Sequence, residues 1–288
     1  MSTPVHIEHM HGTGNAFLVV DAKRTSWPSD AAAFARVACD RTTGVVDPST
    51  GVHGADGVLV LTLVGDAVVR MRLVQPDGST AAMCGNGARV AAAWAAERLG
   101  TDHLTVEAPA GRFAAVVDGS EVDIEMNAPR FDPAEIPIRA DAPLVDAPVD
   151  GQHATAVWTG VPHLVLFVDG VDAVALAQLA PPLRHHPLFP EGTNVTIATQ
   201  TAPQVFAQRT FERGVEAETQ ACGTGAVAIA AVATRLGHAD ATQPVTVRPP
   251  GGTLTVLLAD AGPAHLIGPV AHTGEQTVDA SQLLEVGG

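Results

Sequence analysis

One motif occurs twice in the sequence, and this duplication limits the possible folds more than any other feature. The first copy, CGNGARVAAAWAAERLG, runs from Cys84 to Gly100, and the second, CGTGAVAIAAVATRLG, runs from Cys222 to Gly237. Each copy consists of a cysteine, a Gly-x-Gly turn, an alanine-rich segment and a closing Arg-Leu-Gly. Because an internal repeat marks a repeated structural unit, the chain is expected to consist of two similar halves.

Both copies predict a helix that begins at the cysteine and ends at the final glycine, a residue that suits the C′ position of a helix. The second helix is apolar on nearly all sides from Ala226 to Ala233. Such a helix must be buried. We therefore expect an α/β (α+β) fold with two pseudosymmetric domains, each a sheet wrapped around a central apolar helix.

Strand patterns surround both copies. They are predicted at 58–64, 67–74, 103–107, 113–117, 121–126, 154–158, 163–168, 194–198, 204–212, 245–248, 253–258 and 265–268. Gly65-Asp66 predicts a hairpin with a type II′ turn between the first two strands.

The two halves are expected to be joined by a proline-rich connector. Residues 127–150 hold five prolines and few apolar clusters, which is typical of a linker. The predicted organisation is an N-terminal half at 1–130, completed by a C-terminal segment at about 270–288, a connector at 131–150 and a C-terminal half at 151–269.

Composition and charge exclude several classes of protein. The formal charge of −15 disfavours nucleic acid and anionic membranes as partners. Three cysteines without a CxxC pair form neither a disulfide scaffold nor a structural zinc site. Met1 to Gly14 lacks the pattern of a secretory signal, and no apolar run is long enough to span a bilayer. We expect a cytoplasmic protein with reduced thiols and no metal.

Each cysteine loop has the chemistry to bind an anion. At the start of a helix the backbone N–H groups lack partners and the macrodipole is positive. Gly85 and Gly87 allow the backbone to approach a ligand closely, and a carboxylate is the ligand that such a site suits. The same field favours the thiolate form of Cys84. One loop therefore predicts both a carboxylate clamp and a reactive sulfur.

Two such loops predict a two-base reaction. If they meet across the domain interface, the sulfurs of Cys84 and Cys222 lie on opposite sides of one α-carbon. One thiolate removes the proton and the opposite thiol returns a proton to the other face, so configuration inverts without a cofactor. Cys39, in the apolar run AAFARVAC, is expected to be an inert buried residue.

Four segments carry a family resemblance over nearly the whole chain: MHGTGNAFLVVDA (10–22), MCGNGARV (83–90), GTNV (192–195) and ERGVEAETQACGTGA (212–226). In these segments the chain resembles the diaminopimelate epimerases. The resemblance implies a mixed sheet in each half and an active site in the interdomain cleft. It also implies interconversion of LL- and meso-2,6-diaminopimelate in lysine and peptidoglycan precursor biosynthesis, by a homodimer, with no pyridoxal phosphate and no metal.

The resemblance implies a role for individual residues. Cys84 and Cys222 would be the acid/base pair. The clamp on the reacting carboxylate would be Gly85, Asn86, Gly223 and Thr224, with side-chain contacts to substrate from Asn15 and Asn194. Glu212 and Arg213 would hold the distal amino-acid end, which agrees with their chemistry. His163 and Glu212 would tune the pKa of a catalytic cysteine. The other eleven histidines, including His185 and His186, are expected on the surface.

The sequence departs from the family pattern at several positions. Val161 stands where an asparagine usually precedes Pro-His, and Gln75 replaces another asparagine but keeps its amide, so it is expected to contact substrate. Ala16 replaces an acidic residue, and the segment 45–57, which ends at Gly57, is expanded. The change at Val161 bears on specificity, because polar recognition of the distal group separates diaminopimelate from simpler amino acids.

Three alternatives stay open at this point. A related two-cysteine racemase could act on proline, hydroxyproline or histidine, although Glu212 and Arg213 favour a substrate with a second amino-acid end. A thiol redox protein would link Cys84 to Cys222, but the spacing of 138 residues does not support it. A binding protein without activity would need the loss of one thiol, and both are present.

Overall fold

The computed structural model describes residues 4–24, 30–260 and 262–286. The chain forms two compact units, Met1–Ile124 with Pro269–Gly288, and Glu125–Gly268. Two predictions fall partly outside the described residues. They are the absence of a secretory signal, at residues 1–3, and the C-terminal segment that completes the first half, at residues 287–288.

The first unit is a closed mixed sheet. Its strands are β1 (Pro4–Gly12), β2 (Asn15–Asp21), β3 (Gly57–Gly65), β4 (Val68–Val74), β5 (Thr80–Ala81), β6 (His103–Ala108), β7 (Gly111–Asp118), β8 (Glu121–Met126) and β17 (Ala264–Asp279). Strand pairing runs β17-β1-β2-β3-β4-β6-β7-β8 and returns to β17. The pairs β2–β3 and β4–β6 are parallel, and the other pairs along the chain of neighbours from β17 to β8 are antiparallel.

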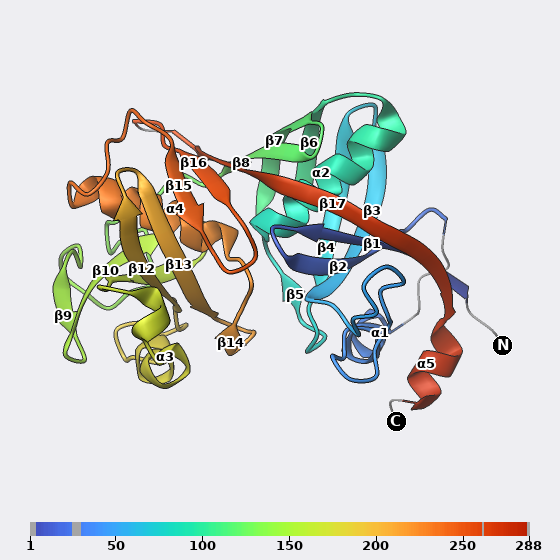
Figure 1. Ribbon diagram of the computed structural model, residues 1–288, viewed down its shortest axis with the longest axis horizontal. Helices are drawn as coiled ribbons and strands as arrows, with labels where there is room; N and C mark the ends of the chain where they lie inside the picture. Colours follow the sequence, from blue (N-terminus) through green and yellow to red (C-terminus); the bar gives the residue numbers. More distant parts are fainter. Residues whose placement is uncertain (1–3, 25–29, 261, 287–288) are drawn as a thin grey trace. The chain divides into compact units, whose positions relative to one another are not determined.

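Helix α2 (Gly85–Leu99) lies inside this sheet (Figure 1). It contacts β1, β3, β4, β6 and β7, and Trp94 on its buried face is fully enclosed. Its end at Gly100, which has φ 65° and ψ 32°, confirms the predicted glycine stop. Helices α1 (Ala31–Ala38) and α5 (Ala280–Val286) pack against each other, and Phe34 of α1 belongs to an apolar cluster of this unit.

The second unit repeats this topology. Its elements are β9 (Ala147–Val149), β10 (Gln152–Trp158), β11 (Pro162–Phe167), a 3₁₀ turn (Val171–Ala173), α3 (Leu176–Arg184), β12 (Asn194–Ala202), β13 (Val205–Glu212), β14 (Ala217–Glu218), α4 (Gly223–Arg235), β15 (Val245–Arg248) and β16 (Leu254–Leu257). The parallel pairs β11–β12 and β13–β15 match β2–β3 and β4–β6. In both units a short strand, β5 or β14, precedes the cysteine and its helix.

Helix α4 confirms the prediction of a central buried helix. Every residue from Gly223 to Ala233 is buried, and the helix contacts β10, β11, β12, β13, β15 and β16. The glycine after its C-cap, Gly237, has φ 77°. The predicted α/β fold of two pseudosymmetric halves is therefore confirmed, while the place of the active site between the halves stays a prediction.

The type II′ turn predicted at Gly65-Asp66 is wrong. Gly65 is the last residue of β3 and pairs with Val68, so Asp66 and Ala67 form the turn. None of these residues has a positive φ, which a type II′ turn requires at its first central position. The cause is a register shift between Leu63 and Gly65, which moves the turn by one residue.

The proline-rich segment 131–150 belongs to the second unit. It is largely irregular but Ile136 is buried, and its end forms β9, where Val149 is buried against the core of this unit. Its backbone also bonds to the sheet, because the Ala156 N–H donates to the Leu144 carbonyl over 2.9 Å. The assignment of this segment as a connector stays a prediction.

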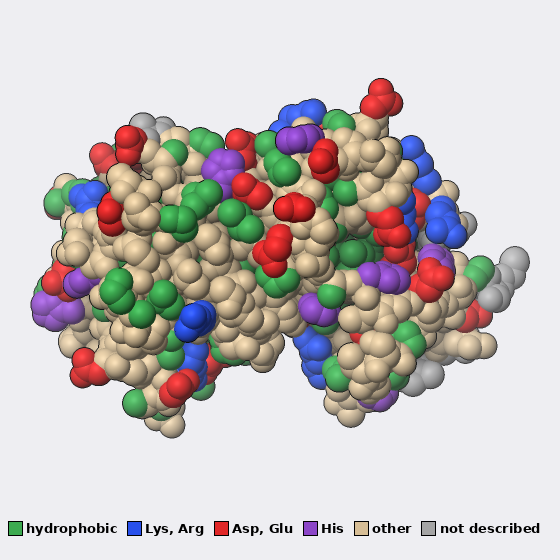
Figure 2. All heavy atoms as spheres, turned by 45° about the horizontal axis from the view of Figure 1, so that its top comes forward, with side chains coloured by type: hydrophobic (Ala, Val, Ile, Leu, Met, Phe, Trp, Pro, Cys, Tyr) green, Lys and Arg blue, Asp and Glu red, His purple; other side chains and the backbone are tan. Residues whose placement is uncertain are grey.

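The surface carries the acidic excess of the sequence. Figure 2 shows Asp and Glu side chains spread over the visible face among a smaller set of basic ones. No helix within the described ranges combines the length and apolar character that crossing a bilayer requires.

Candidate active site

The first cysteine caps the central helix of its unit. Cys84 is the N-cap residue of α2, in an extended conformation, and its Sγ accepts a hydrogen bond from the Gly87 N–H over 3.4 Å. Gly85, Asn86 and Gly87 are buried, while Cys84 itself is partly exposed. This confirms the predicted position of the cysteine at a helix N-terminus, where N–H groups without an acceptor inside the helix and the dipole favour an anion.

A chain of polar side chains lies behind this loop. The Asn86 Nδ2 group donates to Asn15 Oδ1 over 2.6 Å, so two residues predicted to contact substrate are in direct contact with each other. Arg89, which is fully buried, donates from Nη2 to Asn86 Oδ1 and to Thr13 Oγ1, both over 2.8 Å. The close approach of β1 to this turn requires Gly12, since a Cβ there would lie 2.9 Å from the Asn86 carbonyl oxygen.

The second cysteine has a different environment. Cys222 is the N-cap residue of α4 and is buried, and its Sγ lies 3.4 Å from Thr224 Oγ1. The Thr224 hydroxyl lies 2.9 Å from His163 Nε2. The predicted link between His163 and a catalytic cysteine therefore runs through a hydroxyl within the second unit.

His163 is held in its neutral form. Burial, with a smaller contribution from the positive charge of Arg213, lowers its pKa to about 3. Its Nδ1 lies 3.0 Å from Thr196 Oγ1, which in turn lies 3.1 Å from Thr210 Oγ1. Gln208 Nε2 donates to Thr210 Oγ1 and to the Cys222 carbonyl, both over 3.1 Å. The network thus returns to the cysteine from which it started.

The residues predicted to bind the distal end of the substrate also lie in the second unit. Asn194 Oδ1 accepts from the Arg213 N–H over 2.8 Å, and Asn194 Nδ2 donates to the Pro162 carbonyl over 3.0 Å. The same Nδ2 group lies 3.5 Å from His163 Nε2, so Asn194 also contacts the histidine beside the second cysteine loop. The Arg213 guanidinium is half-buried, and the Glu212 carboxylate accepts from the Thr219 hydroxyl.

A buried arginine ties the two loops of this region together. Arg184, at the end of α3, donates from Nε and Nη2 to Glu216 Oε1 over 3.0 and 2.7 Å. Gly192 of the GTNV loop has φ 71°, and a Cβ there would also lie 1.6 Å from Arg184 Nη1, so this position favours glycine. We call this Arg184–Glu216 ion pair the clasp, and it joins the loop of Asn194 to the turn that follows Arg213.

Gln75 and Val161, two of the positions that depart from the family pattern, both lie in hydrogen-bonded turns. Gln75 is half-buried and its Oε1 accepts from the Ser79 hydroxyl over 2.7 Å, so the oxygen of its carboxamide is used within its own turn. Val161 closes a tight turn in which its carbonyl accepts from the Thr159 N–H over 3.1 Å. The Thr159 hydroxyl donates to the Thr224 carbonyl in the second cysteine loop over 3.0 Å.

Cys39 and the remaining histidines test two further predictions. Burial raises the pKa of the Cys39 thiol to about 12, as expected for an inert buried residue. The expectation that the remaining histidines lie on the surface is wrong for His9, which is buried, with Nε2 2.7 Å from Gln276 Nε2. Its strand β1 is covered by the expanded segment 45–57, whose Asp47 lies 3.8 Å from His9 Nδ1.

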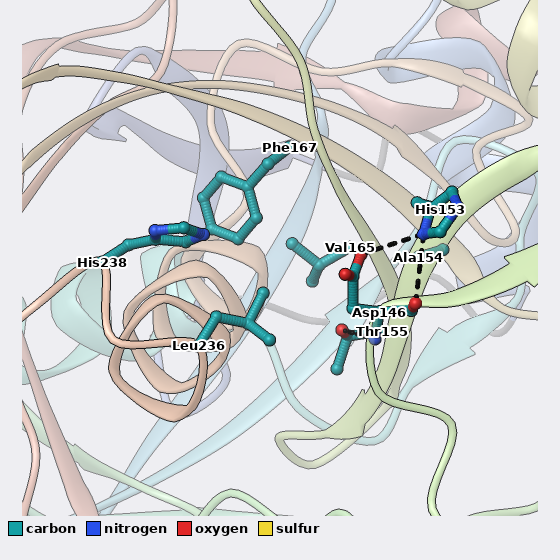
Figure 3. A pocket seen from close by; sticks show the side chains of 8 residues that line it. All are labelled: Asp146, His153, Ala154, Thr155, Val165, Phe167, Leu236 and His238. Carbon is teal, nitrogen blue, oxygen red and sulfur yellow. Dashed lines mark hydrogen bonds and ion pairs between the residues drawn. The ribbon is translucent and has the colours of Figure 1, made fainter.

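A separate cavity of about 210 Å³ opens in the second unit (Figure 3). It lies at the C-terminal end of α4, between His238 stacked edge-on against Phe167 and His153 bonded to Asp146. Cys222 lies at the opposite end of this 13-residue helix, about 20 Å away at 1.5 Å per residue. In the part of the chain that the structure describes, no group of three or more His, Cys, Asp or Glu side chains could hold a metal ion.

Sequence reasoning missed the polar residues behind both loops: Thr13, Arg89, Thr196, Gln208 and Thr210. Two features of the sequence point to some of these residues. Arg89 is a charged residue within a helix whose repeat is apolar on nearly all sides, and Gln208 and Thr210 alternate along a strand with the spacing of one face.

The fold occurs in other proteins of known structure. A phenazine biosynthesis protein of the PhzF family from Bacillus anthracis matches with a TM-score of 0.65 and 16% identity, over 96% of this chain and 99% of the other. A hydroxyproline epimerase from Agrobacterium vitis matches with a TM-score of 0.63 and 18% identity, over 96% and 92%. At such low identities the likeness concerns the fold alone.

Comparison of sequences identifies the family. The family model described as diaminopimelate epimerase matches residues 8–131 and 155–274. A diaminopimelate epimerase of Methanothrix thermoacetophila is 42% identical over 258 residues, which cover 87% of this chain and 88% of the relative. A diaminopimelate epimerase of Methanocella arvoryzae is 39% identical over 292 residues, which cover 98% of this chain and 100% of the relative. The chain belongs to the diaminopimelate epimerase family and is an isomerase.

Proposed function

We propose that this chain interconverts LL- and meso-2,6-diaminopimelate at one α-carbon, with Cys84 and Cys222 as the thiolate–thiol pair and without a cofactor. Membership of the family supports the substrate. The observation that carries the chemistry is that both cysteines cap helices whose first turns are buried and contain two glycines.

In the proposed reaction one thiolate takes the α-proton. The C–H bond breaks, its electron pair stays on the α-carbon, and an S–H bond forms. The thiol on the other side donates its proton to the opposite face of the carbon and becomes a thiolate. Configuration inverts, the enzyme keeps one proton in total on its two sulfurs, and the reverse reaction exchanges their roles.

Stabilisation of the carbanion would come from the two helix N-termini. Charge that develops at the α-carbon spreads into the α-carboxylate. The backbone N–H groups of the first turns of α2 and α4, which point out of the helix starts, would donate to it, from Gly85, Asn86, Gly223 and Thr224. These donors are fixed by the helices, so they cost no reorganisation when the charge appears.

The distal amino-acid end would be held by Glu212, Arg213 and Asn194. Arginine offers a planar fork for a carboxylate, and glutamate accepts from an ammonium. Asn15 and Gln75 would add contacts to the substrate from the first unit. Neutral His163 would act on Cys222 through the Thr224 hydroxyl, and Glu212 would also influence the thiol.

We also propose the setting of the activity. The enzyme would work in the cytoplasm as a homodimer, in the synthesis of lysine and of peptidoglycan precursors. Reduced thiols, which the reaction requires, persist in that compartment.

Deuterium exchange tests the two-base mechanism. Wild type, Cys84→Ser and Cys222→Ser are incubated in D2O with LL- or meso-diaminopimelate, and α-deuterium uptake and stereoisomer are followed by NMR and chiral chromatography. Each variant is expected to fail from a different starting stereoisomer. Equal residual epimerisation by both variants would contradict the assignment.

A substrate panel separates this function from its relatives. Proline, hydroxyproline and histidine are assayed beside LL-diaminopimelate by polarimetry. Turnover of one of these amino acids without turnover of diaminopimelate would show that the specificity differs.

Oxidation gives a second test of the facing sulfurs. Hydrogen peroxide takes two electrons and two protons from the thiols, which form one disulfide while the peroxide is reduced to water. Activity is expected to fall with formation of a Cys84–Cys222 disulfide and to return with dithiothreitol. Full activity of the oxidised enzyme without reductant would show that the geometry is wrong.

A further inference from the structure

Arg89 is a fully buried charge behind the first cysteine loop. Its Nη2 group donates to Thr13 and Asn86, while Nε and Nη1 find no acceptor among the residues that the structure describes. Burying a guanidinium without satisfying all of its N–H groups is unfavourable for stability. An apolar residue would fit a buried helix better, which points to a role in the site rather than in the core.

The backbone of Thr13, which accepts a hydrogen bond from Arg89 through its hydroxyl, is in an unfavourable conformation. Thr13 is β-branched and has φ 50°, in the turn between β1 and β2. Such residues are rarely found in the left-handed region, and holding one there costs of order 1–3 kcal/mol. The turn that carries Asn15 is therefore held in one conformation and bonded to the guanidinium of Arg89.

The hydrogen bonds from Arg89 have only one possible direction. Because arginine only donates, Asn86 must turn its Oδ1 to Arg89, and its Nδ2 then donates to Asn15 Oδ1. Asn15 therefore has its Nδ2 group left as a donor. In the proposed function Asn15 contacts the substrate, and a substrate carboxylate is an acceptor that this orientation suits.

The charge of Arg89 also acts on the cysteine. Burial lowers the pKa of Arg89 to about 10, while the negative charges of the Cys84 thiolate and of Glu121 on β8 raise it, so the group is a cation at neutral pH. The acidic side chain that β1 turns to α2, Glu8, is paired with Arg98 and Trp94 further along the helix. Arg89 is bonded to Asn86, two residues from Cys84 in the same loop, and a nearby cation favours the thiolate form of a thiol.

The second loop has no counterpart of this cation. Five residues after Cys222, at the position equivalent to Arg89, stands Val227, which is buried in α4. A buried cation at this helix position is therefore present in the first of the two repeated loops and replaced by an apolar side chain in the second.

We propose that Arg89 is a positioning residue for the first half of the reaction: its buried charge favours the thiolate of Cys84, and its bond to Asn86 sets Asn15 as a donor to the substrate carboxylate. This inference rests on the proposed function for its second part only.

Alkylation of Cys84 tests the charge effect without any substrate. Wild type, Arg89→Gln and Arg89→Lys react with iodoacetamide across pH 5–10, and modification of Cys84 is measured by peptide mass spectrometry. Arg89→Gln is expected to raise the apparent pKa of Cys84 by about one unit or more, which slows alkylation about tenfold at pH values below it. Arg89→Lys keeps the charge and is expected to restore the profile.

Epimerase kinetics test the orientation of Asn15. Arg89→Gln is expected to raise KM for diaminopimelate about tenfold, because the carboxamides of Asn86 and Asn15 are free to flip. Arg98→Gln is the matched control: it removes a partly buried arginine of the same helix that contacts Glu8 and Trp94, and it should leave both readouts unchanged.

The outcomes are distinguishable. A folded Arg89→Gln variant, as judged by circular dichroism, with the thiol profile and KM of wild type would overturn the inference. If Arg89→Gln does not fold, Arg89→Lys decides: a Cys84 pKa that rises by one unit although the charge is kept overturns the charge effect, and a wild-type profile supports it. Failure of the wild type to epimerise diaminopimelate would refute the proposed function and leave the alkylation result standing.

Discussion

The two cysteine loops are repeats, yet they should respond differently to the same substitution. Gly225 and Gly87 both stand three residues after their cysteines. A Cβ on Gly225 would lie 2.6 Å from Gln208 Nε2, 3.1 Å from Thr210 Oγ1 and 3.2 Å from the Cys222 sulfur. A Cβ on Gly87 would meet only the end of the Leu59 side chain at 3.2 Å and the Cys84 side chain at 3.6 Å.

The magnitude for Gly225→Ala follows from these contacts. Displacing Gln208 breaks its two hydrogen bonds, to Thr210 and to the Cys222 carbonyl, at about 1 kcal/mol each. Overpacking in a fixed core costs a further ~1–3 kcal/mol. Alanine in place of glycine in a helix regains about 1 kcal/mol. The expected loss in the free energy of unfolding is therefore about 2–4 kcal/mol.

Gly87→Ala serves as the matched control. The terminal methyl of Leu59 can move by a few tenths of an ångström, so the clash is small and the gain in helix propensity, about 1 kcal/mol, offsets it. Its free energy of unfolding is expected to lie within about 1 kcal/mol of wild type.

Urea unfolding followed by circular dichroism measures both values, and epimerase assays at saturating substrate report on the sulfur. Gly225→Ala is expected to lose at least about tenfold in kcat as well as stability, because the added methyl would lie 3.2 Å from the Cys222 sulfur, which is one of the two bases in the proposed function. A Gly225→Ala protein as stable and as active as Gly87→Ala would refute the reasoning, since it would mean that the second loop relaxes freely.

Three further predictions follow from single groups. His163 has a folded pKa of about 3, below its ordinary value of 6.5, so its contribution to stability is present above pH 6.5 and falls as the pH drops below it. The free energy of unfolding in urea should fall by about 2 kcal/mol between pH 8 and 5 because of this residue, and His163→Gln should remove that share. Cys39, with a pKa of about 12, should resist iodoacetamide at pH 8 in the native protein, as peptide mass spectrometry can check. Glu216→Gln should raise KM about threefold with little change in kcat, because it loosens the clasp on Arg184 that holds the distal-end loops; an unchanged KM would show that the clasp does not position them.

Much of the fold could be predicted because the repeat carries it. The buried helix from Gly223 to Ala233 and the glycine stop at Gly100 follow from patterns within one segment. The order in which the strands pair in the sheet does not follow from such local patterns. Strand β17 runs from Ala264 to Asp279 and pairs with β1 and β16, which are separated from each other by more than 240 residues, and no local pattern encodes such pairing.

The repeat by itself predicted only the cysteine loops of the candidate site, and the other candidate residues followed from the family resemblance. The cysteines and glycines are recognisable since their function depends on the helix start that the sequence itself specifies. Gln208 and Arg89 act through side-chain contacts with residues 14 and 76 positions away, and such partners appear only once the strands are aligned. The turn at Asp66 was mispredicted for a related reason, because a one-residue register shift depends on the pairing of two strands.

The duplication explains why the two loops can differ although their backbones match. In each unit the helix start supplies the donors and the field, so the side chains packed behind it are free to set the properties of one sulfur alone. Behind Cys84 these side chains are a buried cation and two carboxamides, whereas behind Cys222 they include a neutral histidine and the Thr224 hydroxyl. A two-base reaction needs one sulfur to start as the thiolate and the other as the thiol. We therefore expect Cys84 to hold the thiolate in the resting enzyme, so that wild type at neutral pH should be alkylated at Cys84 before Cys222; faster modification of Cys222 would contradict it.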